Sequence, residues 1–149
     1  MSHPSNPNAV LSNERLLSAS PQQVFAAFSN PDHLARWWGP SGFTNTFDVF
    51  EFKRDGRWVF TMHGPTGVDY ANECVFREIE PDSRLVIEHI VTPWFRLTVT
   101  LVPQGAHTHL AWTQEFESPE VADRMRPLCM TANEQNLDRL QALLATLNA

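Results

Sequence analysis

Two asparagines interrupt the apolar face of the predicted C-terminal helix. Residues three and four apart on a helix share a face, and such steps from Cys129 reach Asn133, Asn136 and Leu140. A buried amide without a hydrogen-bonding partner costs about 1–3 kcal/mol, so each asparagine needs one. We interpret Asn133 and Asn136 as cavity-facing groups that orient a polar part of a ligand. The alternative is that they bond to strand backbone or lie on the flank of the helix.

Histidine is the other residue type that could act chemically here, because its imidazole titrates near neutral pH. His89 has the same strand parity as Leu85 and Ile87, which predicts an inward direction. His63 ends a predicted strand and has the opposite parity to Met62. We weigh both histidines as ligand contacts and place His89 ahead of His63.

Other arrangements of chemical groups are weak in this sequence. His107 and His109 share a strand face, as metal ligands can, but they flank the Gln104-Gly105 turn and fit an exposed hairpin better. The chain has no phosphate-binding glycine loop, dinucleotide fingerprint, His-Glu-x-x-His helix or Gly-x-Ser-x-Gly elbow. Its strand carboxylates do not form a convincing acid–base pair. We expect no metal, no cofactor and no complete catalytic constellation.

Adjacent tryptophans precede the Gly39-Pro40 break. Neighbouring helical residues point about 100° apart, so Trp37 and Trp38 cannot both face one surface. We expect one to pack in the core and the other to cover a cavity entrance beside Phe43, since aromatic side chains supply large apolar area. The alternative is that both are core residues.

Alternation along the strands and periodicity along the helix extend the candidate ligand cavity. For each added residue, plain core packing is the alternative. The added candidates are Trp58, Phe60, Met62, Phe76, Ile87, Trp112 and Gln114 on strands, and Met125, Cys129 and Leu140 on the helix.

The elements that would position these residues have clear signals. Ser20-Pro21 with Gln23 predicts a capping box, and Asn30-Pro31 and Ser118-Pro119 repeat the cap-and-proline start. Residues 43–117 form short β-rich runs separated by turn residues, and an early strand is expected at about residues 10–17. Pro127 predicts a kink or break in the last helix. The order strand, two short helices, six strands and long helix predicts an α+β fold with one sheet wrapped around that helix.

Bulk composition limits the function classes. The chain has 149 residues, which suits one domain; we assign 1–9 to a flexible arm and 10–149 to the domain. A net charge of −6 with 11 Lys+Arg argues against nucleic acid or an anionic membrane surface. No apolar run approaches the roughly 20 residues of a membrane span, and no secretory signal is apparent. With only two cysteines, expected to be buried thiols, we predict a soluble cytoplasmic protein.

Several motifs resemble one known family. These are "RWWGPSGF", "DGRWVFTMHGPTG", "EPDSRLVIEH", "LTVTLV" and "ANEQNLDRLQALL". Together with the element order, they resemble the START-like (SRPBCC) superfamily over residues 10–147, in the branch named after the activator of the 90-kDa heat-shock protein ATPase. The sequence departs from the branch at two turns, 54–56 and 81–84. The resemblance implies a helix-grip (START/Bet v-like) fold: a bent antiparallel sheet grips the long helix and leaves a cavity.

Three functions are consistent with these features. The leading hypothesis is a protein that binds a small, mostly apolar molecule in that cavity. The second is a protein-interaction module, with a protein partner or a homodimer contact at exposed apolar residues. Chaperone activators of this branch use two domains, and this chain has room only for the one similar to their C-terminal part. The third is an enzyme of the cyclase, aromatase or hydratase kind.

Overall fold

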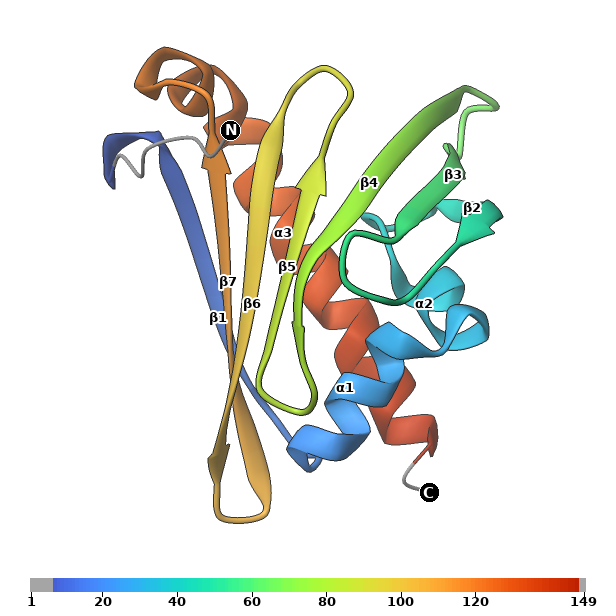
Figure 1. Ribbon diagram of the computed structural model, residues 1–149, viewed down its shortest axis with the longest axis vertical. Helices are drawn as coiled ribbons and strands as arrows, with labels where there is room; N and C mark the ends of the chain where they lie inside the picture. Colours follow the sequence, from blue (N-terminus) through green and yellow to red (C-terminus); the bar gives the residue numbers. More distant parts are fainter. Residues whose placement is uncertain (1–6, 148–149) are drawn as a thin grey trace.

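The computed structural model describes residues 7–147, which form one curved seven-stranded antiparallel sheet and three α-helices (Figure 1). The strand order is β1-β7-β6-β5-β4-β3-β2. The strands are β1 (Val10–Leu17), β2 (Thr44–Phe50), β3 (Arg57–His63), β4 (Asp69–Glu80), β5 (Arg84–His89), β6 (Phe95–Gln104) and β7 (His107–Phe116). This architecture confirms the predicted helix-grip fold.

The two short helices start where the sequence predicts. Helix α1 (Pro21–Ser29) has a complete capping box between Ser20 and Gln23. Helix α2 (Pro31–Trp37) starts after Asn30, whose side chain accepts a hydrogen bond from the Asp32 amide at 3.0 Å. Side-chain acceptors at these positions satisfy backbone N–H groups that have no partner within the helix.

Helix α3 (Pro119–Leu147) crosses the concave face of the sheet diagonally (Figure 1). It begins after Ser118, whose hydroxyl accepts from the Val121 amide. Pro127 does not break it, so the expectation of a break is wrong. Its first turns, in orange, run at an angle to the remainder (Figure 1), which is the effect expected of a proline that removes one backbone donor.

The N-terminal part of the chain packs more closely than expected. Residues 1–6 of the predicted arm lie outside the described residues. Residues Pro7–Ala9 form a short 3-10 helix, and Ala9 is buried.

Buried apolar residues form two clusters. The large cluster contains Trp37, Trp58, Phe76 and Leu140, and α1 and α2 contribute to it. The small cluster lies at the start of α3 and consists of Leu11, Phe116, Val121 and Ala122.

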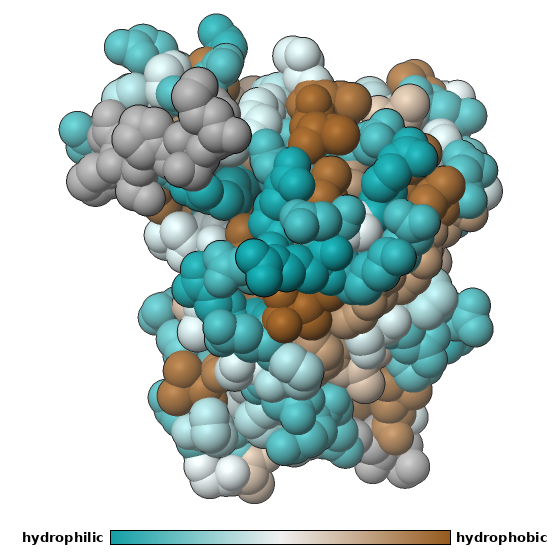
Figure 2. All heavy atoms as spheres, viewed as in Figure 1, coloured by the Kyte–Doolittle hydropathy of each residue, from teal (hydrophilic) through white to brown (hydrophobic). Residues whose placement is uncertain are grey.

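The outward face of the sheet is polar. Ion pairs join Arg77 to Glu88 at 2.6 Å and Arg96 to Glu115 at 2.6 Å on positions that alternate with the core positions. Figure 2 shows hydrophilic side chains over the middle of this face, with separate brown areas around them. Among the described residues, no helix is long and apolar enough to cross a membrane.

Candidate ligand cavity

A cavity of about 500 Å³ lies between the concave face of the sheet and α3. Its walls come from strands β3–β7, from α3 and from the loop that joins α2 to β2. The wall includes buried residues of the large cluster, and also Phe95, Met125 and Cys129, which pack against the small cluster. Tyr70 and Leu128 also line it and are 49% and 67% exposed, which places the mouth beside them.

Most of the candidate cavity residues line this space. They are Trp38, Phe43, Phe60, Met62, His89, Trp112, Gln114, Met125, Cys129, Asn133 and Asn136. Strand parity and helix periodicity assigned their faces, and the curvature of the sheet brings those faces together.

Five candidates lie in the large cluster and do not line the cavity: Trp37, Trp58, Phe76, Ile87 and Leu140. The structure places them outside the cavity wall, contrary to the prediction, because neighbouring side chains of the large cluster pack around them. For Trp58 and Phe76 these are Phe60, Phe50 and Phe52, at centroid distances of 4.2 to 6.1 Å. Strand parity predicts which face of the sheet a residue occupies, but not whether that part of the face borders the cavity or is covered by other elements. Here α1, α2 and their loop cover this part of the concave face.

Of the two adjacent tryptophans, one is a core residue as expected, and the other lines the cavity but does not cover its entrance. Trp37 is fully buried, and its indole N–H donates to the Ala27 carbonyl at 2.9 Å. Trp38 ends α2 in an extended conformation and lines the cavity, with its ring 5.7 Å from that of Trp112. Trp38 is also a buried member of the large cluster, so it forms an inner wall of the cavity, whereas Trp37 does not line the cavity.

Several wall residues were not among the candidates. They include Asn72 and Cys74 on β4, Phe95 and Leu97 on β6, and Tyr70. Tyr70, Asn72 and Cys74 have the same strand parity as Phe76. Strand parity could therefore have identified these three residues of β4 as wall candidates.

Asn136 holds the α2–β2 loop rather than facing a ligand with free groups. Its amide nitrogen donates to the Trp37 carbonyl at 2.8 Å, and its oxygen accepts from the Gly39 amide at 3.3 Å. Gly39 has φ of 99°, a conformation that favours glycine, and a Cβ there would lie 2.8 Å from Met62 Cε. Asn136 therefore bonds to backbone, as the alternative interpretation predicted, but the backbone groups belong to the end of α2 and the loop after it and not to a strand.

Arg139 anchors the same loop. Its guanidinium donates to five backbone carbonyls at 2.8–3.2 Å, those of Arg36, Trp38, Gly39, Pro40 and Phe43. Partial burial lowers the pKa of Arg139. Because all of these residues except Arg36 line the cavity, Arg139 positions that wall without lining it.

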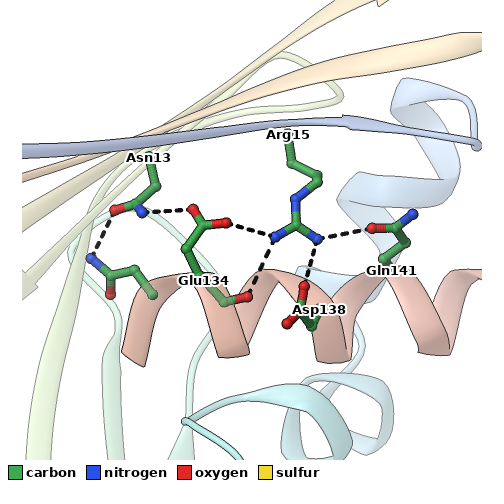
Figure 3. A network of polar contacts seen from close by, with 6 residues as sticks. Asn13, Arg15, Glu134, Asp138 and Gln141 are labelled. Atoms are coloured by element: carbon green, nitrogen blue, oxygen red, sulfur yellow. Dashed lines mark hydrogen bonds and ion pairs between the residues drawn. The ribbon is translucent and has the colours of Figure 1, made fainter. Parts of the chain in front are cut away.

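Asn133 is the second amide of the stripe, and it belongs to a polar network. Its nitrogen donates to Asn13 Oδ1 and to Gln114 Oε1, each at 3.1 Å. Asn13 in turn donates to Glu134 at 2.8 Å, and Arg15 donates to Glu134 at 2.9 Å. Figure 3 shows the side chains of Asn13 and Arg15 reaching from β1 to α3.

The same network ties β1 to α3 further along the helix. Arg15 also pairs with Asp138 at 2.9 Å and donates to Gln141 at 2.9 Å (Figure 3). The side chain of Arg15 is 19% exposed, so these contacts are partly shielded from water. The network holds Asn133 in one orientation.

His89 forms a second polar site on the opposite wall. Its Nδ1 lies 2.7 Å from the Pro93 carbonyl, and its Nε2 lies 2.7 Å from Asn72 Oδ1. A carbonyl oxygen only accepts hydrogen bonds, so Nδ1 carries a proton. A hydrogen bond from Nε2 to Asn72 Oδ1 requires a proton on Nε2 as well. Burial lowers the pKa of His89, which favours the neutral ring. The neutral ring bonds to Asn72 only if the Asn72 amide turns to present its N–H.

The remaining titratable wall groups are thiols and a phenol. Burial raises the pKa of the Cys74 and Cys129 thiols, so both are neutral at pH 7. Among the described residues, no Lys, Arg, Asp or Glu lines the cavity.

The other three candidate histidines, His63, His107 and His109, lie apart from the cavity. His63 contacts Thr46 and Asp69 on the sheet surface, and His109 lies 3.4 Å from Glu14. His107 is exposed beside the β6–β7 turn. Within residues 7–147, no group of three or more His, Cys, Asp or Glu side chains could hold a metal ion.

Comparisons with known proteins agree with this architecture. A family model described as "Activator of Hsp90 ATPase homolog 1-like protein" matches residues 18–145. A search among curated proteins gives no match.

Solved structures of similar fold come from several bacteria. A crystal structure of a protein from Nitrosomonas europaea has a TM-score of 0.89 at 17% identity and covers 97% of this chain and 99% of its own. One from Rhodobacter sphaeroides has a TM-score of 0.84 at 28% identity, covering 95% and 97%. One from Silicibacter pomeroyi, a protein named AHSA1, has a TM-score of 0.76 at 22% identity, covering 93% and 99%. At these identities the first and third share the fold alone.

Proposed function

The chain belongs to the family of Activator of Hsp90 ATPase homolog 1-like proteins, and we propose that it binds a small, mostly apolar molecule in the cavity between its sheet and α3. The cavity carries this proposal. Its volume of about 500 Å³ lies within the range of roughly 300–1,000 Å³ that holds drug-sized ligands. Its walls are mainly aromatic and aliphatic, with a few polar groups at fixed places, as small-molecule sites usually are.

The chemistry of the walls favours binding over catalysis. General acid–base catalysis needs a positioned acid and base, and His89 is the one imidazole among the described wall residues. The carboxylates of the network in Figure 3 are held by Asn13 and Arg15 and do not line the cavity. We place this binding protein in the cytoplasm, a proposal that rests on its charge and its two unpaired cysteines.

The test is native mass spectrometry of freshly purified protein, followed by solvent extraction and mass analysis of released material. A small molecule bound in a one-to-one ratio supports the proposal and reveals its chemical class. Protein of apo mass, with no change in melting temperature across lipids, aromatic compounds and polyketide-like compounds, contradicts it. That result would favour the protein-interaction hypothesis and a search for a bound protein.

A further inference from the structure

The polar network fixes which atoms Asn133 and Gln114 turn toward the cavity. Arg15 can only donate hydrogen bonds and the Glu134 carboxylate can only accept them. Asn13 therefore presents its N–H to Glu134, at 2.8 Å, and its carbonyl to Asn133, at 3.1 Å. Asn133 must then present its N–H group to Asn13.

The same logic continues to Gln114. Both hydrogens of Asn133 Nδ2 are taken, by Asn13 Oδ1 and by Gln114 Oε1. Asn133 Oδ1 is left as an acceptor and Gln114 Nε2 as a donor. Both side chains line the cavity, and they are only 8% and 7% exposed. An acceptor and a donor from adjoining amides thus lie together in one buried wall.

The walls disfavour a charged ligand. No Lys, Arg, Asp or Glu of residues 7–147 lines the cavity, and the nearest charged groups of the network are already paired. An ionised carboxylate placed there would lose its hydration without gaining a counter-charge. A neutral group that both donates and accepts would instead satisfy both amides.

We propose that the Asn133–Gln114 pair selects uncharged ligands that carry a hydroxyl or carboxamide group on an apolar body. This inference rests on the proposed binding function and specifies the chemistry that the cavity accepts. Asn133 Oδ1 accepts from the ligand O–H or N–H, and Gln114 Nε2 donates to the ligand oxygen. The aromatic walls, including Trp38 and Trp112, contact the apolar body.

Four probes with one scaffold test this proposal at pH 7.5: biphenyl-4-carboxamide, 4-hydroxybiphenyl, 4-methylbiphenyl and biphenyl-4-carboxylate. Affinity is measured by calorimetry and by tryptophan fluorescence. We expect the carboxamide and the hydroxyl compound to bind about tenfold more tightly than the methyl compound, because each satisfies buried polar groups. The carboxylate should bind most weakly.

Variants then locate the preference. Asn133→Leu and Gln114→Met keep similar volumes and should reduce the carboxamide-to-methyl affinity ratio to about one. Gln104→Met is the matched control, since it makes the same change at an exposed position that does not line the cavity, and it should leave the ratio unchanged. Circular dichroism and melting temperature establish that each variant is folded. If a variant does not fold, the affinity ratio measured on wild-type protein still tests the proposal.

The outcomes separate this inference from the proposed function. Equal binding of the carboxamide and methyl compounds to wild-type protein, or a ratio that survives in both amide variants, overturns the inference and leaves cavity binding intact. Tightest binding of the carboxylate also overturns it. Failure of all four probes to bind contradicts the proposed function and the inference with it.

Discussion

At the scale of single residues, His89 combines burial with two oxygen contacts. Its ring stacks on Phe95 with centroids 4.5 Å apart, and it is 6% exposed. Burial disfavours the imidazolium, while the backbone carbonyls of Pro93 and Val91 favour it. Burial is the larger effect, so the pKa of His89 is lowered from its ordinary value of 6.5.

The lowered pKa of His89 predicts a loss of stability in mild acid. In the unfolded chain the histidine takes up a proton near pH 6.5, whereas in the folded protein it does so only at lower pH. The free energy of unfolding should therefore fall as pH drops below about 6.5, with a slope of at most about 1.4 kcal/mol per pH unit from this residue. Urea unfolding of wild type and His89→Gln between pH 7.5 and 5 measures the difference.

The control for the His89 prediction is His107→Gln, at an exposed position beside a turn. It should keep the wild-type dependence on pH. If His89→Gln loses stability in acid as steeply as wild type does, the pH dependence belongs to other groups.

The two thiols differ in access, although burial raises the pKa of both. Cys74 is 2% exposed on β4, and Cys129 is partly exposed on α3 near the cavity mouth. We expect iodoacetamide at pH 8 to modify Cys129 first and Cys74 only on unfolding. Peptide mass spectrometry follows both sites, with Cys129→Ser as control. Faster modification of Cys74 would contradict the cavity geometry.

At the scale of elements, the α2–β2 loop is held by α3 through side-chain bonds to its backbone. Besides Arg139 and Asn136, Gln135 accepts from the Ser41 amide at 3.2 Å. The loop therefore has a defined conformation without belonging to a helix or strand. Its backbone carbonyls find their donors on a helix that comes about a hundred residues later.

Replacing Arg139 should loosen this loop. Lysine offers one ammonium in place of a planar guanidinium, so Arg139→Lys cannot reach five carbonyls at once. We expect the variant to lose about 1–3 kcal/mol of unfolding free energy through unsatisfied carbonyls, measured by urea denaturation. Arg126→Lys, at an exposed pair with Asp123, is the control and should change stability by less than about 0.5 kcal/mol. Equal effects of the two changes would refute the anchoring role.

The first residue of each helix is determined by the local sequence. Ser20, Asn30 and Ser118 each accept a backbone hydrogen bond from within three residues, so the signal and the partner lie together in the chain. Pro127 is different, because the local pattern left a kink and a break as alternatives, and α3 continues through this residue with a bend.

At the scale of the whole molecule, the hydrophobic interior consists of two clusters of unequal size. The large cluster spans the sheet, α1, α2 and the later turns of α3. The small cluster fixes the first turns of α3 with only a few buried residues. Local stability follows the amount of buried apolar contact, so the two ends of α3 should differ.

Hydrogen exchange should reveal this difference. We expect amides of residues 120–129 to exchange at least about tenfold faster than those of residues 133–144, because the small cluster is slight and Pro127 removes one helical hydrogen bond. A bound ligand should slow exchange in the first segment, since Met125 and Cys129 line the cavity. Mass spectrometry of pepsin fragments measures both segments. Uniform exchange along α3 would contradict the prediction.

Local patterns determined the fold class, the helix starts and the face that each strand and helix residue presents. These features depend on periods of two and 3.6 residues and on caps within one turn, all of which a sequence displays directly. The family motifs further predicted that the sheet curves around α3. The same periods are sufficient to predict that Asn133, Gln114 and His89 face the interior.

The tertiary structure alone decided how those groups are used. Asn136 and Asn133 have the same residue type and lie on one helix face, yet the first bonds to Trp37 and Gly39 and the second to Gln114 and Asn13. The Gly39 contact joins residues 97 positions apart, and the Asn13 contact joins residues 120 apart. No local period encodes such partners, because they depend on how the curved sheet, the loop and the helix meet. The packing of the sheet, the loop and the helix also determines which aromatic residues are core residues and which form a cavity wall.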